Sequence, residues 1–108
     1  MTRIDGMPGD EWERALRANE LSLGLDDLVV GTIQGEHAVL LDYTRGEYYG
    51  LNSVATVVWR LLRDGKQFGE IVAAVVAEYD VSEAIAARDI AGMLADLRDK
   101  GVVIARRV

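Results

Sequence analysis

The stretch that decides the fold is Leu28–Leu51, with the sequence LVVGTIQGEHAVLLDYTRGEYYGL. Two tight-turn signals divide it. Gly35 suits a two-residue turn, because glycine tolerates a positive φ, and Gly46 is expected in the left-handed position of a longer turn. The three runs between the turns are rich in branched and aromatic residues, as strands are: Leu28–Ile33, Ala38–Leu41 and Glu47–Leu51. Two consecutive hairpins predict an antiparallel three-stranded sheet that buries one face.

Beyond this sheet the spacing of apolar residues changes from two to about 3.6, which predicts three helices. The first begins at Asn52 or Ser53 and ends at Gly65, and the second runs over residues 68–79. Ser82 caps the third helix, which reaches residue 100 and stops at Gly101. The expected core consists of Trp59, the apolar end 102–104 and the inward helix faces Val54, Val57, Val58, Leu61, Leu62, Ile71, Val72, Val75, Val76, Ile90, Met93, Leu94 and Leu97.

The two ends of the chain are assigned to an arm and a tail. The first 27 residues are polar and irregular, and they are expected to form a loosely attached arm. A short helix within the arm is expected to start at Asp10 as N-cap, with Glu13 three residues later and Trp12 and Leu16 on one face. The predicted organisation is therefore an N-terminal arm at 1–27, a folded domain at 28–104 and a tail at 105–108.

Composition limits the function. The 108 residues suffice for one domain, and 12 Lys and Arg against 18 Asp and Glu give a net charge of −6, which argues against nucleic-acid binding. No cysteine is present, so disulfides, thiolate metal sites and cysteine nucleophiles are excluded, and a metal would have only His37 and carboxylates as ligands. The first five residues lack the apolar run of a signal peptide, and the longest apolar run, Ile71–Ala77, is too short to span a membrane. A soluble cytoplasmic protein without metal or cofactor is expected.

The candidate catalytic residues have simpler explanations. Ser53 lies at a helix start, without a G-x-S-x-G elbow or a neighbouring histidine. His37 beside Glu36 flanks a turn and is expected at the surface. The glycines do not form a phosphate-binding loop. No constellation supports an enzyme, so none of these residues is assigned a catalytic role.

Two other features indicate a binding module. The third predicted strand ends the sheet, so one edge, with Glu47, Tyr48, Tyr49 and Gly50, is unpaired unless another element covers it. On the third predicted helix, one face mixes apolar and acidic residues at spacings of four, four, three and four: Ile85, Asp89, Met93, Asp96 and Lys100. An open strand edge beside such a helix suits an extended peptide, whose backbone pairs with the strand while its side chains reach the helix.

An ordered set of motifs carries a family resemblance across residues 28–104. The set is Leu41-Asp42-x-x-x-Gly46-x-Tyr48-x-x-Leu51-Asn52, a helix with Trp59 and Leu62-x-x-Gly65, Glu70-Ile71-Val72, Tyr79-Asp80-Val81, and Asp89-Ile90-x-x-Met93-Leu94-x-x-Leu97-x-x-x-Gly101-Val102-Val103. Together they resemble the PqqD-like proteins, which are recognition elements for the precursors of ribosomally synthesised, modified peptides. The discrete B1 proteins of lasso-peptide biosynthesis are the most similar members.

The resemblance implies an α+β, winged-helix-turn-helix-like fold with a three-stranded antiparallel sheet followed by three helices, and no catalysis. It implies binding of a precursor's leader segment, which adds to the third strand and lies against the third helix, and presentation of that precursor to a leader peptidase or another modifying enzyme. Carried over by position, the strand contacts are Glu47, Tyr48, Tyr49 and Gly50, and the helix contacts are Ile85, Asp89, Met93 and Asp96.

Departures from the family pattern leave alternatives open. The Pro-Glu typical of the pyrroloquinoline quinone chaperone is missing after the second strand, which disfavours that pathway. Gln67 replaces a usual Thr cap, so that the start of the second helix is expected to fray without affecting the site. Other readings are a PqqD-type chaperone of another peptide-modification pathway and a winged-helix DNA-binding protein. A monomer or a weak dimer is expected, since pairing of two open edges would occupy the same surface.

Overall fold

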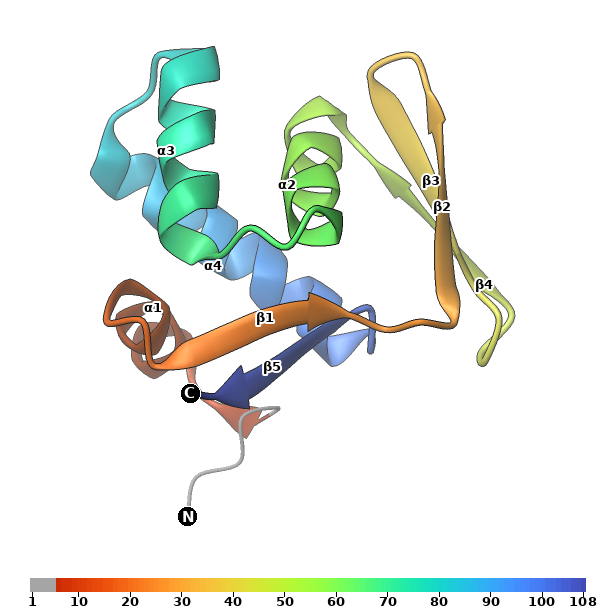
Figure 1. Cartoon of the computed structure of the whole chain (residues 1–108), viewed down its shortest axis with the longest axis horizontal. Coiled ribbons are helices and arrows are strands. Elements are labelled where there is room, and N and C mark those ends of the chain that lie inside the picture. The colour runs from red at the N-terminus through yellow and green to blue at the C-terminus, as the bar shows by residue number, and fades with distance from the viewer. Residues whose placement is uncertain (1–5) are drawn as a thin grey trace.

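The computed structural model describes residues 6–108 and divides them into two small sheets and a helical layer (Figure 1). The expected absence of a signal peptide depends on residues 1–5, which lie outside the described residues. In chain order the elements are α1 (Gly9–Arg17), β1 (Leu21–Leu25), β2 (Val29–Gln34), β3 (His37–Asp42), β4 (Glu47–Leu51), α2 (Ser53–Arg63), α3 (Phe68–Tyr79), α4 (Glu83–Asp99) and β5 (Val103–Arg107).

The predicted three-stranded sheet is confirmed, with strand order β2-β3-β4 and both pairs antiparallel. Gly35 and Gly46 both adopt positive φ, at 65° and 67°, in the two turns where the sequence predicts them. One face of the sheet packs on α2, where Trp59 is buried. A side chain at Gly31 would collide with the Trp59 ring, so a glycine there allows the helix to approach.

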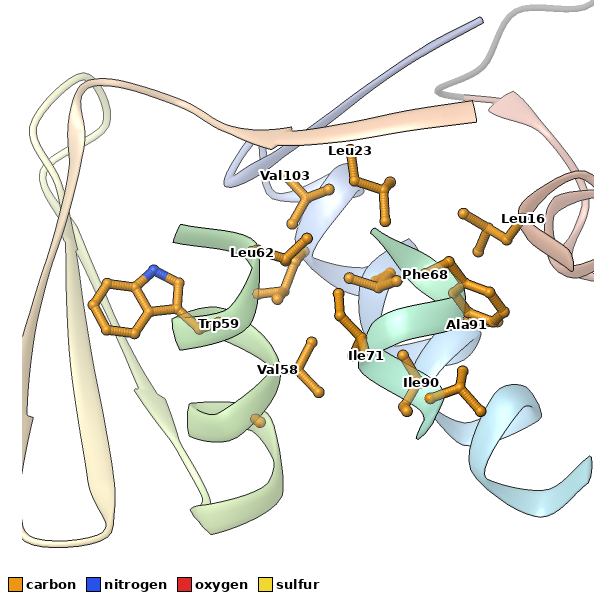
Figure 2. Close-up of a cluster of buried hydrophobic side chains, with 14 of the residues drawn as sticks. Leu16, Leu23, Val58, Trp59, Leu62, Phe68, Ile71, Ile90, Ala91 and Val103 are labelled. Atoms are coloured by element: carbon orange, nitrogen blue, oxygen red, sulfur yellow. The ribbon is translucent and has the colours of Figure 1, made fainter. Parts of the chain in front are cut away.

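The three predicted helices are present with the expected boundaries. Asn52 caps α2 by accepting from the backbone N–H of Ala55 at 2.8 Å, and Ser82 caps α4 by accepting from Ile85 at 3.2 Å. Most of the predicted core side chains are buried, whereas Val54, Val57, Leu61, Val76 and Met93 are only half-buried. Ile104, also expected in the core, is exposed. Figure 2 shows Val58, Ile71 and Ile90 from the three helices meeting in the core, with Trp59 turned toward the sheet.

The expectation of a loosely attached arm is wrong for the described residues. The Trp12 indole is 1% exposed and donates to the Ala91 carbonyl of α4 at 2.8 Å, which fixes α1 against the helical layer. The next segment forms β1, which pairs antiparallel with β5, so the expected tail is part of a second sheet. Residues 6–108 therefore form an α+β fold with four helices and two sheets: the short helix expected in the arm is present as α1, but it belongs to the fold, which is not limited to one sheet followed by three helices.

Details of the caps also differ from the expectation. The N-cap of α1 is Pro8, while Asp10 lies in the first turn, where a carboxylate favours the helix dipole. The expected fraying at the start of α3 is not seen, because the backbone N–H of Gln67 donates to the Glu70 side chain at 3.1 Å and so closes the first turn. The Gln67 side-chain amide accepts from the Leu23 N–H at 2.8 Å and donates to the Leu23 carbonyl at 3.1 Å, and thereby occupies the second edge of β1. No helix among the described residues is long and apolar enough to cross a membrane.

Candidate functional site

The strand β4 is an edge strand, since it pairs with β3 on one side and with no described strand on the other. Its backbone groups can be assigned to the two sides. The two-residue turn makes Gln34 and His37 a hydrogen-bonded pair, and in antiparallel ladders such pairs alternate. Continued through the register of β3 and β4, the alternation turns Tyr49 toward β3 and leaves the N–H and C=O groups of Tyr48 and Gly50 on the open edge.

The side chains of β4 alternate between the two faces of the sheet. Glu47 and Tyr49 lie on the face turned toward the helices, where the Tyr49 hydroxyl donates to Glu47 Oε2 at 2.8 Å. This hydrogen bond to the carboxylate, together with partial burial, raises the pKa of Tyr49 above its usual value. Tyr48 points the other way and is 71% exposed.

The predicted helix residues occupy a partly exposed face of α4. Ile85 is 48% exposed, Met93 is half-buried, and Asp89 and Asp96 are both exposed. The Asp89 carboxylate lies 3.8 Å from the guanidinium of Arg88, in a pair that is open to solvent. This face therefore combines accessible apolar surface with two available negative charges.

The two candidate surfaces meet at the C-terminal end of α4. Arg45, in the turn before β4, donates from its Nη1 to Asp42 Oδ2 at 3.0 Å and to the Lys100 carbonyl at 2.7 Å. Among residues 6–108, this last bond is the one hydrogen bond between the β3–β4 hairpin and the end of α4. Lys100 also places its Nζ 5.6 Å from the centre of the Tyr49 ring. We call the contacts of Asp42, Arg45 and Lys100 the Arg45 bridge.

Among the described residues, hydrogen bonding joins the two surfaces at this end. Lys100 follows Met93 and Asp96 at helical spacings of seven and four, so the face that carries these residues ends over Tyr49. Ile85 and Asp89 lie nearer the N-terminal end of α4, and no hydrogen bond or ion pair of the described residues joins them to β4. Sequence reasoning missed the Arg45 bridge. Its signal was an acid followed three residues later by an arginine across a turn, which is common in turns without such a role.

The carboxylate in the Arg45 bridge is buried, since Asp42 is 1% exposed. Burial acts to raise the pKa of this carboxyl, but hydrogen bonds from the Arg45 side chain and from the backbone N–H groups of Arg45 and Thr44 outweigh it. The folded-state pKa of Asp42 therefore lies below the ordinary value of 3.8. The carboxylate stabilises the hairpin in its charged form.

A pH dependence of stability follows from the lowered pKa of Asp42. The unfolded chain binds this proton more tightly than the folded chain, so the stabilisation is fully present above pH 3.8 and is lost as the pH falls through the lower folded-state pKa. We expect urea midpoints of the wild type to fall more steeply below about pH 4 than those of Asp42→Asn. Parallel curves for the two proteins would show that the carboxylate makes no such contribution.

The other sequence candidates have structural positions. His37 Nδ1 lies 3.2 Å from the Leu51 carbonyl, at the far end of β4 from the Arg45 bridge. Ser53 is the first residue of α2, behind the Asn52 cap. Neither lies beside the face of α4 that carries Met93, because the structure places both at the junction of β4 and α2.

The chain is similar to a known protein family and to two solved structures. The family model of coenzyme PQQ synthesis protein D (PqqD) matches residues 37–103. Among solved structures, TbiB1 in complex with the TbiA(beta) leader peptide is 36% identical, with a TM-score of 0.73 over 74% of this chain and 93% of that chain. A lasso peptide synthetase B1 complexed with the leader peptide is 32% identical, with a TM-score of 0.67 over 77% and 98%. A comparison with curated proteins finds no match.

Proposed function

Because this chain belongs to the PqqD family, we propose that it recognises the leader segment of a ribosomally synthesised precursor peptide, which adds to β4 as a further strand. The observation that carries the proposal is the open edge of β4, beside a helix face with apolar and acidic side chains. Both similar structures, at 36% and 32% identity, are described as complexes with a leader peptide. The protein acts as a binding module, without catalysis of its own.

Two parts of the site contribute differently. The backbone groups of Tyr48 and Gly50 pair with any extended chain, so they supply affinity with little choice of sequence. On the inner side, Tyr49 and Met93 hold an apolar side chain of the peptide. Charge complementarity then selects leaders with basic residues near the exposed carboxylates of Asp89 and Asp96. Glu47 and Ile85 complete the strand and the helix contacts.

The bound precursor is then presented to a modifying enzyme. Leader peptidase is the first candidate, because both similar structures are B1 proteins and one is described as part of lasso peptide synthesis. In this proposal the β2–β4 sheet and helices α2–α4, within residues 28–104, form the recognition part in a winged-helix-like arrangement. The β1–β5 sheet and α1 pack against these helices. A PqqD-type chaperone of another peptide-modification pathway would use the same edge.

A winged-helix DNA-binding protein is the candidate from another class. The helix that would enter a groove is α4, and it exposes Asp89, Asp96 and Asp99. Duplex phosphates repel such a face, and the net charge of −6 adds to the repulsion. Retention of random duplex DNA in a gel shift at low salt would favour this candidate over the peptide.

Titration with labelled leader peptides tests the proposal. The first probe is the TbiA(beta) leader peptide, followed by a panel of other lasso leaders and a scrambled version of each. We expect saturable binding by one leader or more, with amide NMR shifts concentrated at β4 and α4. Binding with shifts confined to other elements would refute the site, and binding of scrambled and intact leaders with equal affinity would refute recognition.

The acidic side chains provide a second, smaller test. We expect Asp96→Ala to weaken binding of a basic leader by roughly threefold at low salt, since exposed charge pairs contribute about 1 kcal/mol or less. The difference from wild type should vanish near 1 M salt, where the Debye length is about 3 Å. Asp99→Ala, on the same helix but outside the predicted line, is the matched control. A loss that is independent of salt would mean that Asp96 does not act through its charge.

A further inference from the structure

The sheet has a second face, turned away from α2, and the described residues do not cover it (Figure 1). The register places Val30, Leu41 and Tyr48 side by side across the three strands on this outer face. Val30 is 49% exposed and Tyr48 is 71% exposed, while Leu41 is half-buried between them. The next row consists of Thr32, Val39 and Gly50. The outer face is therefore apolar up to the open edge of β4.

Gly50 interrupts this apolar face at its edge. Glycine weakens the interior of a strand, and it usually marks a bulge, a special backbone conformation or the close approach of another chain. The register of β3 with β4 runs through Gly50 without a bulge, and its φ is not positive. Apart from Gly50 itself and its two neighbours in the chain, no atom of the described residues lies within 4 Å of the place that a Cβ would take there. The fold itself thus does not require this glycine.

We call the open space that the missing side chain of Gly50 leaves on the outer face the notch. The half-buried Val39, the cross-strand partner of Gly50, and the exposed ring of Tyr48 border this open space on the outer face, and no atom of either lies within 4 Å of the place that a Cβ of residue 50 would take. The other side is the open edge. The N–H and C=O groups of Tyr48 and Gly50 point to the open edge. An antiparallel strand that adds to β4 therefore forms its hydrogen-bonded pairs with these two residues, and one of its own residues lies directly opposite each of them. Side chains of directly opposed residues lie on the same face of a sheet.

We infer that the bound peptide is read on both faces of the sheet, and that its residue opposite Gly50 is a large apolar residue which fills the notch against Val39 and Tyr48. The inference rests on the proposed strand addition and names a further requirement on the same peptide. An aromatic or long aliphatic side chain covers an edge glycine well in cross-strand packing. A charged peptide residue opposite Gly50 would lie over apolar surface, because none of Val39, Tyr48 and Gly50 carries a charge that could pair with it.

Selection from a displayed library of random 14-residue peptides tests the inference. On wild type we expect two apolar positions next to each other in the chain, one facing α4 and one facing the notch. Gly50→Thr fills the notch but keeps the backbone N–H, and threonine favours strands, so the variant should fold. A peptide selected on wild type should bind Gly50→Thr about fivefold more weakly, which corresponds to the loss of one good cross-strand pair. Val30→Thr, on the same face but two strands away, is the control and should bind it within about twofold.

The outcomes separate the inference from the proposed function. One outcome would overturn the inference alone: the selected peptides show a single apolar position, Met93→Asp removes the preference at that position, and Gly50→Thr changes nothing. The peptide would then not contact the notch, but strand addition to β4 would stand. If neither Met93→Asp nor Gly50→Thr changes the selected sequences, peptide binding at this site is itself wrong. If Val30→Thr weakens binding as much as Gly50→Thr, the peptide covers the outer face and the notch is not its specific contact.

Discussion

Replacing Gly50 with proline is expected to lower the affinity for a leader peptide on the order of a hundredfold, because it removes a backbone donor from the open edge and places a ring in the path of the added strand. Proline is tolerated in an edge strand where its missing N–H would have faced solvent. The alternation of pairs along β4 assigns the Gly50 N–H to that side. The variant should therefore fold while its edge no longer accepts a partner. Fluorescence titration with a bound leader measures the loss.

The matched control for this substitution lies on the opposite edge of the same sheet. Ile33, on β2, also turns its N–H away from the sheet, since its neighbour Gln34 pairs with His37. Ile33→Pro should keep the affinity within about threefold, provided that circular dichroism shows the fold intact. Equal losses from Gly50→Pro and Ile33→Pro would show that proline acts through the sheet as a whole. An unchanged affinity for Gly50→Pro would exclude strand addition to β4.

Replacing Met93 with aspartate is expected to weaken leader binding about thirtyfold, or roughly 2 kcal/mol, because interface energy is concentrated in a few buried apolar contacts. Met93 is half-buried, and it lies on the helix face that ends at Lys100 over the Tyr49 ring. A carboxylate at this point would have to be desolvated beneath the peptide. The same titration, with the thermal midpoint as a check on folding, measures the effect.

Ala84→Asp is the control for the charge. Ala84 is exposed on the first turn of α4, about 13 Å along the helix from Met93, and an added carboxylate is favourable there. Its affinity should match the wild type within about twofold. If Ala84→Asp and Met93→Asp weaken binding alike, the added negative charge of the whole helix is the cause. If Met93→Asp has no effect, the groove between β4 and α4 is not where the peptide binds.

The parts of the fold that could be predicted are those whose signals are local. The strand over Glu47–Leu51 and the helix over Ser53–Arg63 begin where the sequence predicts, since the turn glycine Gly46 and the cap Asn52 lie directly before them. The position of β4 at the sheet edge follows from the order of two hairpins. The role of the eight predicted site residues stays a prediction.

The parts that sequence reasoning missed depend on distant partners. In the segment Leu21–Leu25 a serine and a glycine separate the three leucines, and no tight turn joins this segment to a neighbouring strand. Its partner β5 lies at the other end of the chain. The Trp12 indole finds its acceptor 79 positions away, on Ala91. A polar segment with one tryptophan therefore looked like a loose arm, although its apolar face completes the core.

The amino-acid sequence by itself determined the α+β order, the sheet with its open last strand, and the amphipathic helix that accompanies it, because hydrophobic periodicity and turn chemistry act over a few residues. Only the tertiary structure decided how the strand and the helix meet. The Arg45 bridge, the side of β4 on which each backbone group lies, and the notch above Gly50 all arise from groups that are brought together across the chain. Such contacts depend on how packed elements are placed, and no local pattern encodes that placement.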